Sequence, residues 1–247
     1  MATSFLTDVR DTLVPHQTDE YGPLPLLLVG MTVLTGLVDA FSYLVLGHVF
    51  VANMTGNVVF LAFALAGAKA FSIAASLVAL ASFSGGALVG GMVTSRFRTN
   101  RGTTLFCTAT LQCCLLAASV VISALSSTPL DAAVHYSLIV VLGLAMGMQN
   151  ATARKLAVPD LTTTVLTLTV TGISADSTLA GGHGSKAGRR LISVLAMLIG
   201  ALVGAALALH VNGTYPLVVA LAIALVIVST TRWLARSAPA WTRPPGN

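Results

Sequence analysis

GLVDAFSYLVLGHVFVANMTGNVVFLAFALAG, residues 36–67, is the stretch that decides the fold. It contains the end of a long apolar segment with one acid, Asp39, then the residues GHVFVA and a second segment that begins with NMTGN. A helix needs about 20 apolar residues to cross a hydrocarbon core of ~30 Å. The first segment, about 24–46, is long enough, and the second, about 53–67, is shorter and more polar. A long crossing helix followed by a broken, shorter one is therefore predicted.

The composition of the whole chain supports a membrane protein. Of 247 residues 55% are apolar and only 9% are charged, against about 25% in soluble domains. Aromatic residues are few and the apolar runs are rich in Ala, Leu, Val and Gly, which predicts helices rather than barrel strands. The net charge of +5 comes from basic residues in gaps between apolar runs, so we expect a lipid bilayer as partner and no nucleic acid.

The order of apolar segments indicates an internal repeat. Six segments are long, at about 24–46, 70–95, 103–125, 132–153, 190–210 and 215–234, and two are short, at about 53–67 and 161–175. The order long, short, long, long occurs twice. We therefore divide the chain into a polar tail (1–22), repeat 1 (23–126), repeat 2 (127–235) and a second tail (236–247). The residues that support the repeat are Asp39-Ala40 with Asn150-Ala151, GALVG at 86–90 with GALVG at 200–204, and NMT at 53–55 with TTT at 162–164.

The distribution of basic residues predicts the topology. If the two short segments dip in and return, and the N-terminus is inside, every Lys and Arg except Lys69 lies inside. If all eight segments cross, the two sides carry similar numbers, which the positive-inside rule disfavours. We therefore expect an all-α membrane protein with six transmembrane helices, two re-entrant helices and both tails cytoplasmic. Three crossings per repeat make the two repeats inverted relative to each other.

Inverted repeats with broken helices place binding sites near the bilayer midplane. The N-termini of the two short helices are expected to face each other there, and such helix ends favour anions. Asp39 is the leading candidate, because an ionisable group within a span is costly. Its alternative is an acid that reaches interfacial water or a basic residue. The full predicted substrate-binding set is Asp39, Asn53, Thr55, Gly56, Asn57, Gln149, Asn150, Arg154, Asp160, Thr162, Thr163 and Thr164.

Simpler roles remain open for several of these residues. The NMTGN residues Asn53, Thr55 and Asn57, like Asp160, can serve only as caps of a broken helix. Arg154 either attracts an anionic substrate or is a cytoplasmic charge that sets topology. Four glycines in GxxxG pairs are predicted to let the two halves pack closely, with a homodimer seam as the alternative; they are Gly86, Gly90, Gly200 and Gly204.

Other chemistries find little support in the residues. The three cysteines and five histidines lack the spacing of metal ligands, and no phosphate-loop sequence is present. We therefore expect no metal, no cofactor and no coupling to ATP within this chain. An intramembrane enzyme needs converging acid and base groups, and only Asp39 stands clearly within a span, so we do not expect an enzyme.

Four stretches together resemble the YoaK family, a group of bacterial multi-pass membrane proteins with a domain of unknown function. They are GLVDAFSY (36–43), NMTGN (53–57), GMQNA (147–151) and PDLTTTV (159–165). The resemblance extends from about Pro25 to Trp233 and implies a bacterial inner-membrane protein. Met148 departs from the small residue expected before Gln149.

The residues lead to one functional hypothesis and one rival. The leading hypothesis is a small secondary transporter or facilitator for a small polar or anionic metabolite, with a passive channel as a variant. The rival is a membrane protein that does not transport but binds or regulates a partner, as a polar tail and GxxxG surfaces would allow. A homo-oligomer is compatible with either.

Overall fold

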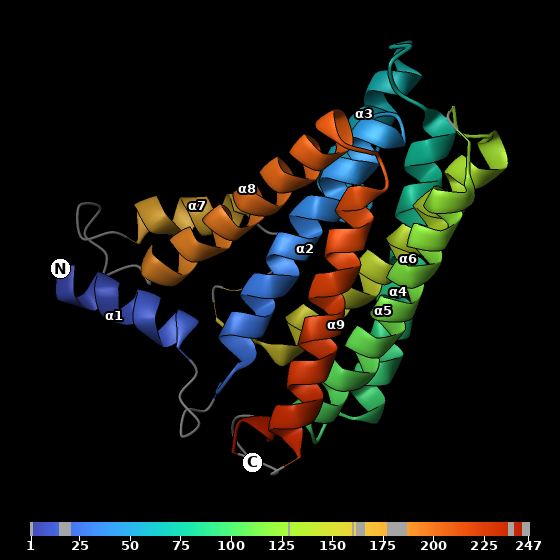
Figure 1. Ribbon diagram of the computed structural model, residues 1–247. Helices are drawn as coiled ribbons and strands as arrows, with labels where there is room; N and C mark the ends of the chain where they lie inside the picture. Colours follow the sequence, from blue (N-terminus) through green and yellow to red (C-terminus); the bar gives the residue numbers. More distant parts are fainter. Residues whose placement is uncertain are drawn as a thin grey trace.

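The computed structural model describes residues 2–14, 21–127, 129–159, 161, 166–176, 187–236 and 240–243. Within these residues the secondary structure is helical and contains no strand (Figure 1). The helices are α1 (Ala2–Leu13), α2 (Leu24–Val45), α3 (Met54–Leu65), α4 (Ile73–Arg96), α5 (Arg101–Leu125), α6 (Ala132–Leu156), α7 (Leu166–Ala175), α8 (Ala187–His210), α9 (Tyr215–Ala235) and the short 3-10 helix η2 (Ala240–Thr242).

Six helices, α2, α4, α5, α6, α8 and α9, are long and apolar enough to cross a membrane. Their bounds lie within a few residues of the six predicted segments, so the predicted fold class is confirmed. The two short helices, α3 with 12 residues and α7 with 10, occupy the predicted breaks and are too short to cross.

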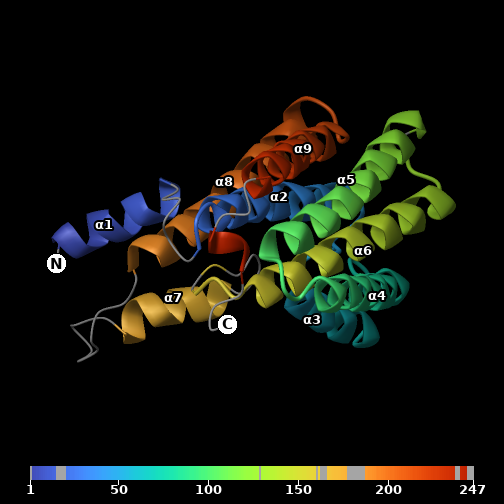
Figure 2. The ribbon, with the colours of Figure 1, turned by 90° about the horizontal axis from the view of Figure 1, so that it is seen from below.

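The two halves of the chain run in opposite directions. In Figure 1, α2 and α5 run upward and α4 runs downward, whereas α6 and α9 run downward and α8 runs upward. The first helix of each half packs most extensively on the middle helix of the other half, so that α2 pairs with α8 and α4 pairs with α6. Each short helix packs on the next long helix of its own half, and α3 and α7 lie well apart in both ribbon views (Figures 1 and 2).

Glycines bring these helix pairs into backbone contact. A Cβ atom on Gly86 of α4 would overlap the carbonyl oxygen of Leu144 in α6, and one on Gly200 of α8 would overlap that of Val33 in α2. Val33 and Leu144 stand 111 positions apart, the same offset as Asp39 and Asn150. The same contact is therefore made twice, once at each inter-half pair.

The second glycine of each motif repeats this relation one turn further on. Gly90 lies against the backbone of Met148, and Gly204 lies against the backbone of Leu37, again 111 positions apart. Glycines on the facing helices, Gly36 of α2 and Gly147 of α6, complete the close approach. We call the contacts of these six glycines the inter-half seam; the six are Gly36, Gly86, Gly90, Gly147, Gly200 and Gly204.

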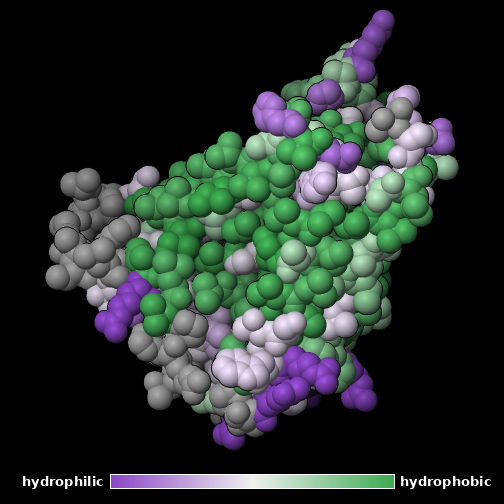
Figure 3. Space-filling view, viewed as in Figure 1, coloured by the Kyte–Doolittle hydropathy of each residue, from purple (hydrophilic) through white to green (hydrophobic). Residues whose placement is uncertain are grey.

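The surface divides into an apolar middle and two polar ends. Large apolar side chains such as Leu88, Leu202 and Val226 are well exposed, as suits a face that contacts lipid tails. Green covers most of the middle of the face in Figure 3, and purple gathers towards its ends. Apart from Lys69, the described Lys and Arg residues belong to α1, to the 97–100 turn or to helix ends on the side where α2 begins, which we call the arginine-rich end.

Both chain tails contain ordered structure, although the sequence predicted only polar tails there. The N-terminal tail includes helix α1, which packs on α8. After α9, the side chain of Trp241 is buried at the arginine-rich end beneath Gly22, where a Cβ would lie within 2.8 Å of the indole. Beside it Arg101 is buried, donates to the carbonyl of Leu156 at 2.7 Å and lies over the ring of Tyr21.

The seam predicts opposite outcomes for two glycines of the same helix. Gly86→Ala places a methyl group against the α6 backbone and should lower the free energy of unfolding by about 1–3 kcal/mol. Gly91→Ala has no atom within 4 Å of the new Cβ and should be neutral or slightly stabilising, because Ala is the better helix former. Thermal unfolding of the purified variants in one detergent measures both, and equal melting temperatures for the two would contradict the seam.

Candidate functional site

Asp39 holds the chain that leads into α3. Its side chain is 4% exposed, and its Oδ1 atom accepts hydrogen bonds from the backbone N–H groups of Ala52 at 2.9 Å and Val51 at 3.3 Å. Asp39 lies six residues, or about 9 Å, before the end of α2, so the chain folds back along α2 by that length before α3 begins.

The carboxylate of Asp39 thus binds the segment just before α3, close to the helix end for which the sequence predicts a capping side chain or an anionic ligand. Asn53 stands at the N-cap position of α3, but its side chain makes no capping hydrogen bond. A negative charge next to the first N–H groups of a helix is favourable. The second carboxylate oxygen, Oδ2, is buried and has no hydrogen-bond partner in the described part of the chain.

Asn57 also holds the segment between α2 and α3, through the backbone of Phe50. It is fully buried; its Oδ1 accepts from the Phe50 N–H at 2.9 Å, and its Nδ2 donates to the Phe50 carbonyl at 2.5 Å. The ring of Phe50 lies so close to Gly56 that a Cβ there would stand 2.7 Å from it. Gly56 and Asn57 thus hold Phe50 in place, whereas Thr55 points outward and is exposed.

A cluster of aromatic rings lies at the Lys69 end of α2, beside α3. The ring of Tyr43, one turn after Asp39, stacks on Phe50 with 5.1 Å between centroids, and Phe50 stacks on Phe60 at 5.6 Å. Such pairs add about 0.5–1.5 kcal/mol beyond the area they bury. We call this group the aromatic cluster; its members are Tyr43, His48, Phe50, Phe60, Phe63 and Phe71.

A second buried polar group joins three helices near the middle of the bundle. Gln112 of α5 donates to Gln149 of α6 at 2.6 Å, and Gln149 donates to the hydroxyl of Thr35 in α2 at 2.7 Å. These side chains are at most 2% exposed. Gln149 is among the residues predicted from the sequence, whereas Gln112 and Thr35 are not. A lone Gln within an apolar run was the available signal for Gln112.

Thr35 and Asp39 connect the two polar groups. They are one helical turn apart, so they share a face of α2, and Ser42 continues that face towards the Lys69 end. We call Thr35, Asp39 and Ser42 the polar column. All three are buried, and the column passes from the Gln112–Gln149 pair, where the two halves meet, to the start of α3.

The remaining predicted residues lie elsewhere. Asn150 donates to the carbonyl of Met146 within its own helix, and Arg154 is exposed at the end of α6. Asp160, Thr162, Thr163 and Thr164 lie outside the described residues. The structure thus brings together Asp39, Asn53 and Asn57, and it places Gln149 one turn of α2 away through Thr35.

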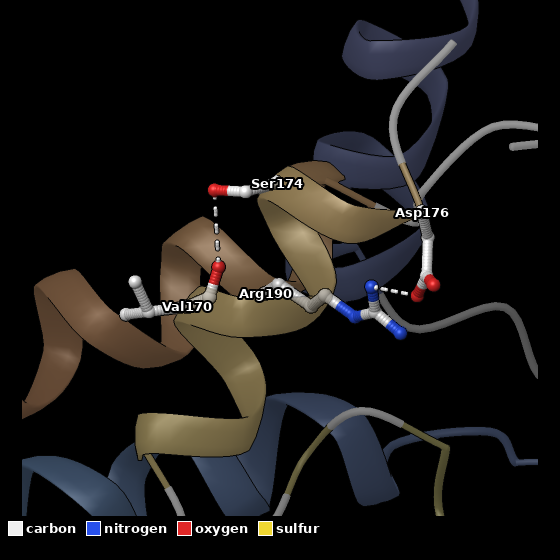
Figure 4. A network of polar contacts seen from close by, with 4 residues as sticks. All are labelled: Val170, Ser174, Asp176 and Arg190. Atoms are coloured by element: carbon white, nitrogen blue, oxygen red, sulfur yellow. Dashed lines mark hydrogen bonds and ion pairs between the residues drawn. The ribbon is translucent and has the colours of Figure 1, made fainter. Parts of the chain in front are cut away.

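The second short helix is held by a different interaction. Arg190 of α8 forms an ion pair with Asp176, just after α7, with 2.6 Å between Nη1 and Oδ2 (Figure 4). Gly172 of α7 leaves room for the same guanidinium group. Asp176 is half exposed, so this contact belongs to the surface, whereas the Asp39 contact that holds α3 is buried.

Comparison with known proteins agrees with a membrane protein. Residues 27–230 match the family described as "Protein of unknown function (DUF1275)". The chain belongs to this family. It is also 34% identical over 152 residues to the UPF0700 transmembrane protein YoaK of Bacillus subtilis (strain 168), covering 61% of this chain and 65% of that protein. The chain therefore spans somewhat less than two thirds of that relative's length.

The match to the DUF1275 family includes both polar groups and the inter-half seam, because it runs from within α2 to within α9. The expected resemblance to the YoaK family is thus confirmed. No solved structure matches the chain.

The Gln112–Gln149 pair predicts non-additive effects of mutation. Gln149→Leu leaves Gln112 and Thr35 without their partner and should cost about 1–3 kcal/mol of unfolding free energy. Adding Gln112→Leu should cost less than the sum of the two single changes, because the double variant leaves fewer unpaired groups.

A double-mutant cycle on melting temperatures in detergent measures this coupling. Ser84→Ala is the matched control, because its hydroxyl is exposed and donates to the Leu80 carbonyl of its own helix; it should leave stability nearly unchanged. Strictly additive losses for the two glutamines would show that they do not act as a pair.

Proposed function

We propose that this protein is a secondary transporter or facilitator for a small polar solute, with the polar column as part of the solute path. The observation that carries the proposal is Asp39, a buried carboxylate with one unpartnered oxygen beside the start of a broken helix. Buried ionisable groups in membrane segments are costly and typically mark substrate or ion pathways.

The arrangement of the halves supports transport rather than a static scaffold. Inverted repeats allow one half to rock against the other and to expose a central site to each side in turn. The polar column and the Gln112–Gln149 pair lie where α2, α5 and α6 meet. A solute bound there would contact both halves.

The charge at the start of α3 narrows the class of solute. The carboxylate of Asp39 already accepts hydrogen bonds from the backbone N–H groups of Val51 and Ala52, just before α3. A second anion at this point would lie beside a buried negative charge, which is unfavourable. We therefore favour an uncharged or cationic polar solute over an anionic one at this site.

The distribution of basic residues suggests how the protein is oriented in the membrane. Lys and Arg residues are enriched in the cytoplasmic ends of membrane proteins, so we propose that the arginine-rich end and both tails lie in the cytoplasm of a bacterium. Lys69 and the aromatic cluster then face the outside of the inner membrane.

The proposal predicts that Asp39→Asn abolishes uptake by reconstituted protein. Proteoliposomes are incubated with a defined mixture of amino acids, polyols, nucleosides and amines, under an imposed pH gradient and membrane potential. Mass spectrometry of the vesicle contents then identifies any compound that enters. We expect at least one compound to accumulate above the level in protein-free vesicles, and Asp39→Asn to reduce it to that level.

Asp131→Asn is the matched control, since Asp131 is exposed at the start of α6 and its side chain makes no capping bond; it should transport like the wild type. Gel filtration of each variant verifies that the protein is folded. Correctly folded wild-type protein that moves none of these compounds would contradict transport and would favour a regulatory or partner-binding protein.

A further inference from the structure

The free oxygen of Asp39 belongs to the one side chain that can carry a negative charge among the buried, unpartnered polar groups of the described residues. Three buried side-chain atoms lack a hydrogen-bond partner among the described residues: Asp39 Oδ2, His135 Nε2 and Ser193 Oγ. The imidazole of His135 stacks on Tyr136 near the start of α6, and Ser193 carries no charge. Only Asp39 is an acid, lies within the polar column and holds a helix start, so its free oxygen has a consequence for function.

We infer that Asp39 is a proton-binding site and that its proton controls the hold of α2 on the segment leading into α3. The inference rests on the proposed function and names the coupling ion. It follows from the two oxygens of one carboxylate having different surroundings: Oδ1 receives backbone N–H donors, and Oδ2 receives none.

The surroundings fit a proton better than a metal ion. A hard cation such as Ca²⁺ takes six to eight oxygen ligands, and Mg²⁺ takes six. The groups facing Asp39 are N–H donors, whose positive ends repel a cation. The described part of the chain also contains no group of three or more His, Cys, Asp or Glu side chains that could hold a metal. A proton needs one oxygen.

No charged side chain in the part of the chain that the structure describes forms an ion pair with Asp39. Its carboxylate accepts hydrogen bonds from the backbone N–H groups of Val51 and Ala52. The helices packed against α2 and the loop after it carry titratable or charged groups, but none of these that the structure describes forms an ion pair with Asp39. Those groups are Asp8, Arg10 and Asp11 of α1, Tyr43 of α2, His48 of the loop, His135, Tyr136, Arg154 and Lys155 of α6, Arg189, Arg190 and His210 of α8, and Tyr215 and Arg232 of α9.

Each protonation state of Asp39 therefore has a physical basis. As an anion it receives charge-assisted hydrogen bonds from the backbone of the segment that leads into α3, and such bonds are roughly twice as strong as neutral ones. As a neutral acid it no longer places an uncompensated charge within the membrane. Taking up one proton converts the carboxylate to a carboxylic acid and weakens the bonds to Val51 and Ala52. Asp39 then holds the segment that leads into α3 less firmly.

The position of Asp39 along α2 places proton entry at the Lys69 end. Asp39 stands six residues before the end of α2. Thr35, one turn earlier, already contacts the buried Gln112–Gln149 pair. Asp39 therefore lies nearer the Lys69 end than the middle of the bundle does.

The inference predicts a carboxyl band that depends on Asp39. In infrared difference spectra of the purified protein in lipid nanodiscs, acidification should produce the C=O stretch of a protonated buried carboxyl group. Asp39→Asn should lack this band and Asp131→Asn should keep it. Hydrogen exchange adds a second readout: the amides of residues 51–53 should exchange faster at acidic than at neutral pH relative to neighbouring amides, and in Asp39→Asn this pH dependence should disappear.

The salt in the buffer separates the proton from a metal cation. Replacing NaCl by N-methylglucamine chloride at constant ionic strength should leave the band and its pH dependence unchanged. A band that Na⁺ removes, or a spectrum that Asp39→Asn does not alter, would overturn the inference. The two proposals fail separately. A carboxyl band that titrates, without solute uptake by the wild type, contradicts transport alone. Solute uptake without the band contradicts the proton site alone.

Discussion

The close approach of α2 to α8 and of α4 to α6 is the constraint on which the rest of the structure depends. In lipid the helices gain little from hiding apolar surface, so their association relies on close packing and on interhelical hydrogen bonds. Gly86 and Gly200 let one backbone touch another, and they do so at equivalent positions of the two halves. Once these pairs form, α2 and α6 are brought to the centre, where Thr35 meets Gln149.

A second constraint is the buried carboxylate of Asp39. It belongs to α2, and it binds the backbone of the segment that leads into α3. The break after α2 leaves backbone N–H groups that need an acceptor at membrane depth. Asp39 supplies that acceptor and is itself stabilised by those groups. The arrangement satisfies the backbone yet leaves one carboxylate oxygen free. Asp39 therefore has a structural role, and the proton-binding role that we propose rests on the same side chain.

Much of the fold could be predicted from the sequence, because membrane helices are set by local properties. Length and apolar composition located all six long helices, and the repeated GALVG at 86–90 and 200–204 indicated a packing contact that the structure places between the halves. The polar site was harder to predict. Asp39 was singled out because a charge within a span is unusual, but nothing local says that residues 51–53 fold back onto it. Gln112 became informative only when α5 was placed beside α6. Helix α1 and the buried Trp241 were missed because a polar tail was judged by its charge and not by its contacts.

The sidedness of the loops tests the central claim, two inverted halves with three crossings each, most directly. Single cysteines at Ala68, Ser95 and Asn212, in a protein whose Cys107, Cys113 and Cys114 are replaced by Ala, are labelled in intact cells with a membrane-impermeant thiol reagent. We predict that the cysteines at Ala68 and Asn212 are labelled and that the one at Ser95 is protected until the membrane is permeabilised. Labelling of Ala68 and Asn212 from opposite sides would mean that the short helices cross the membrane, and the inverted arrangement would be wrong.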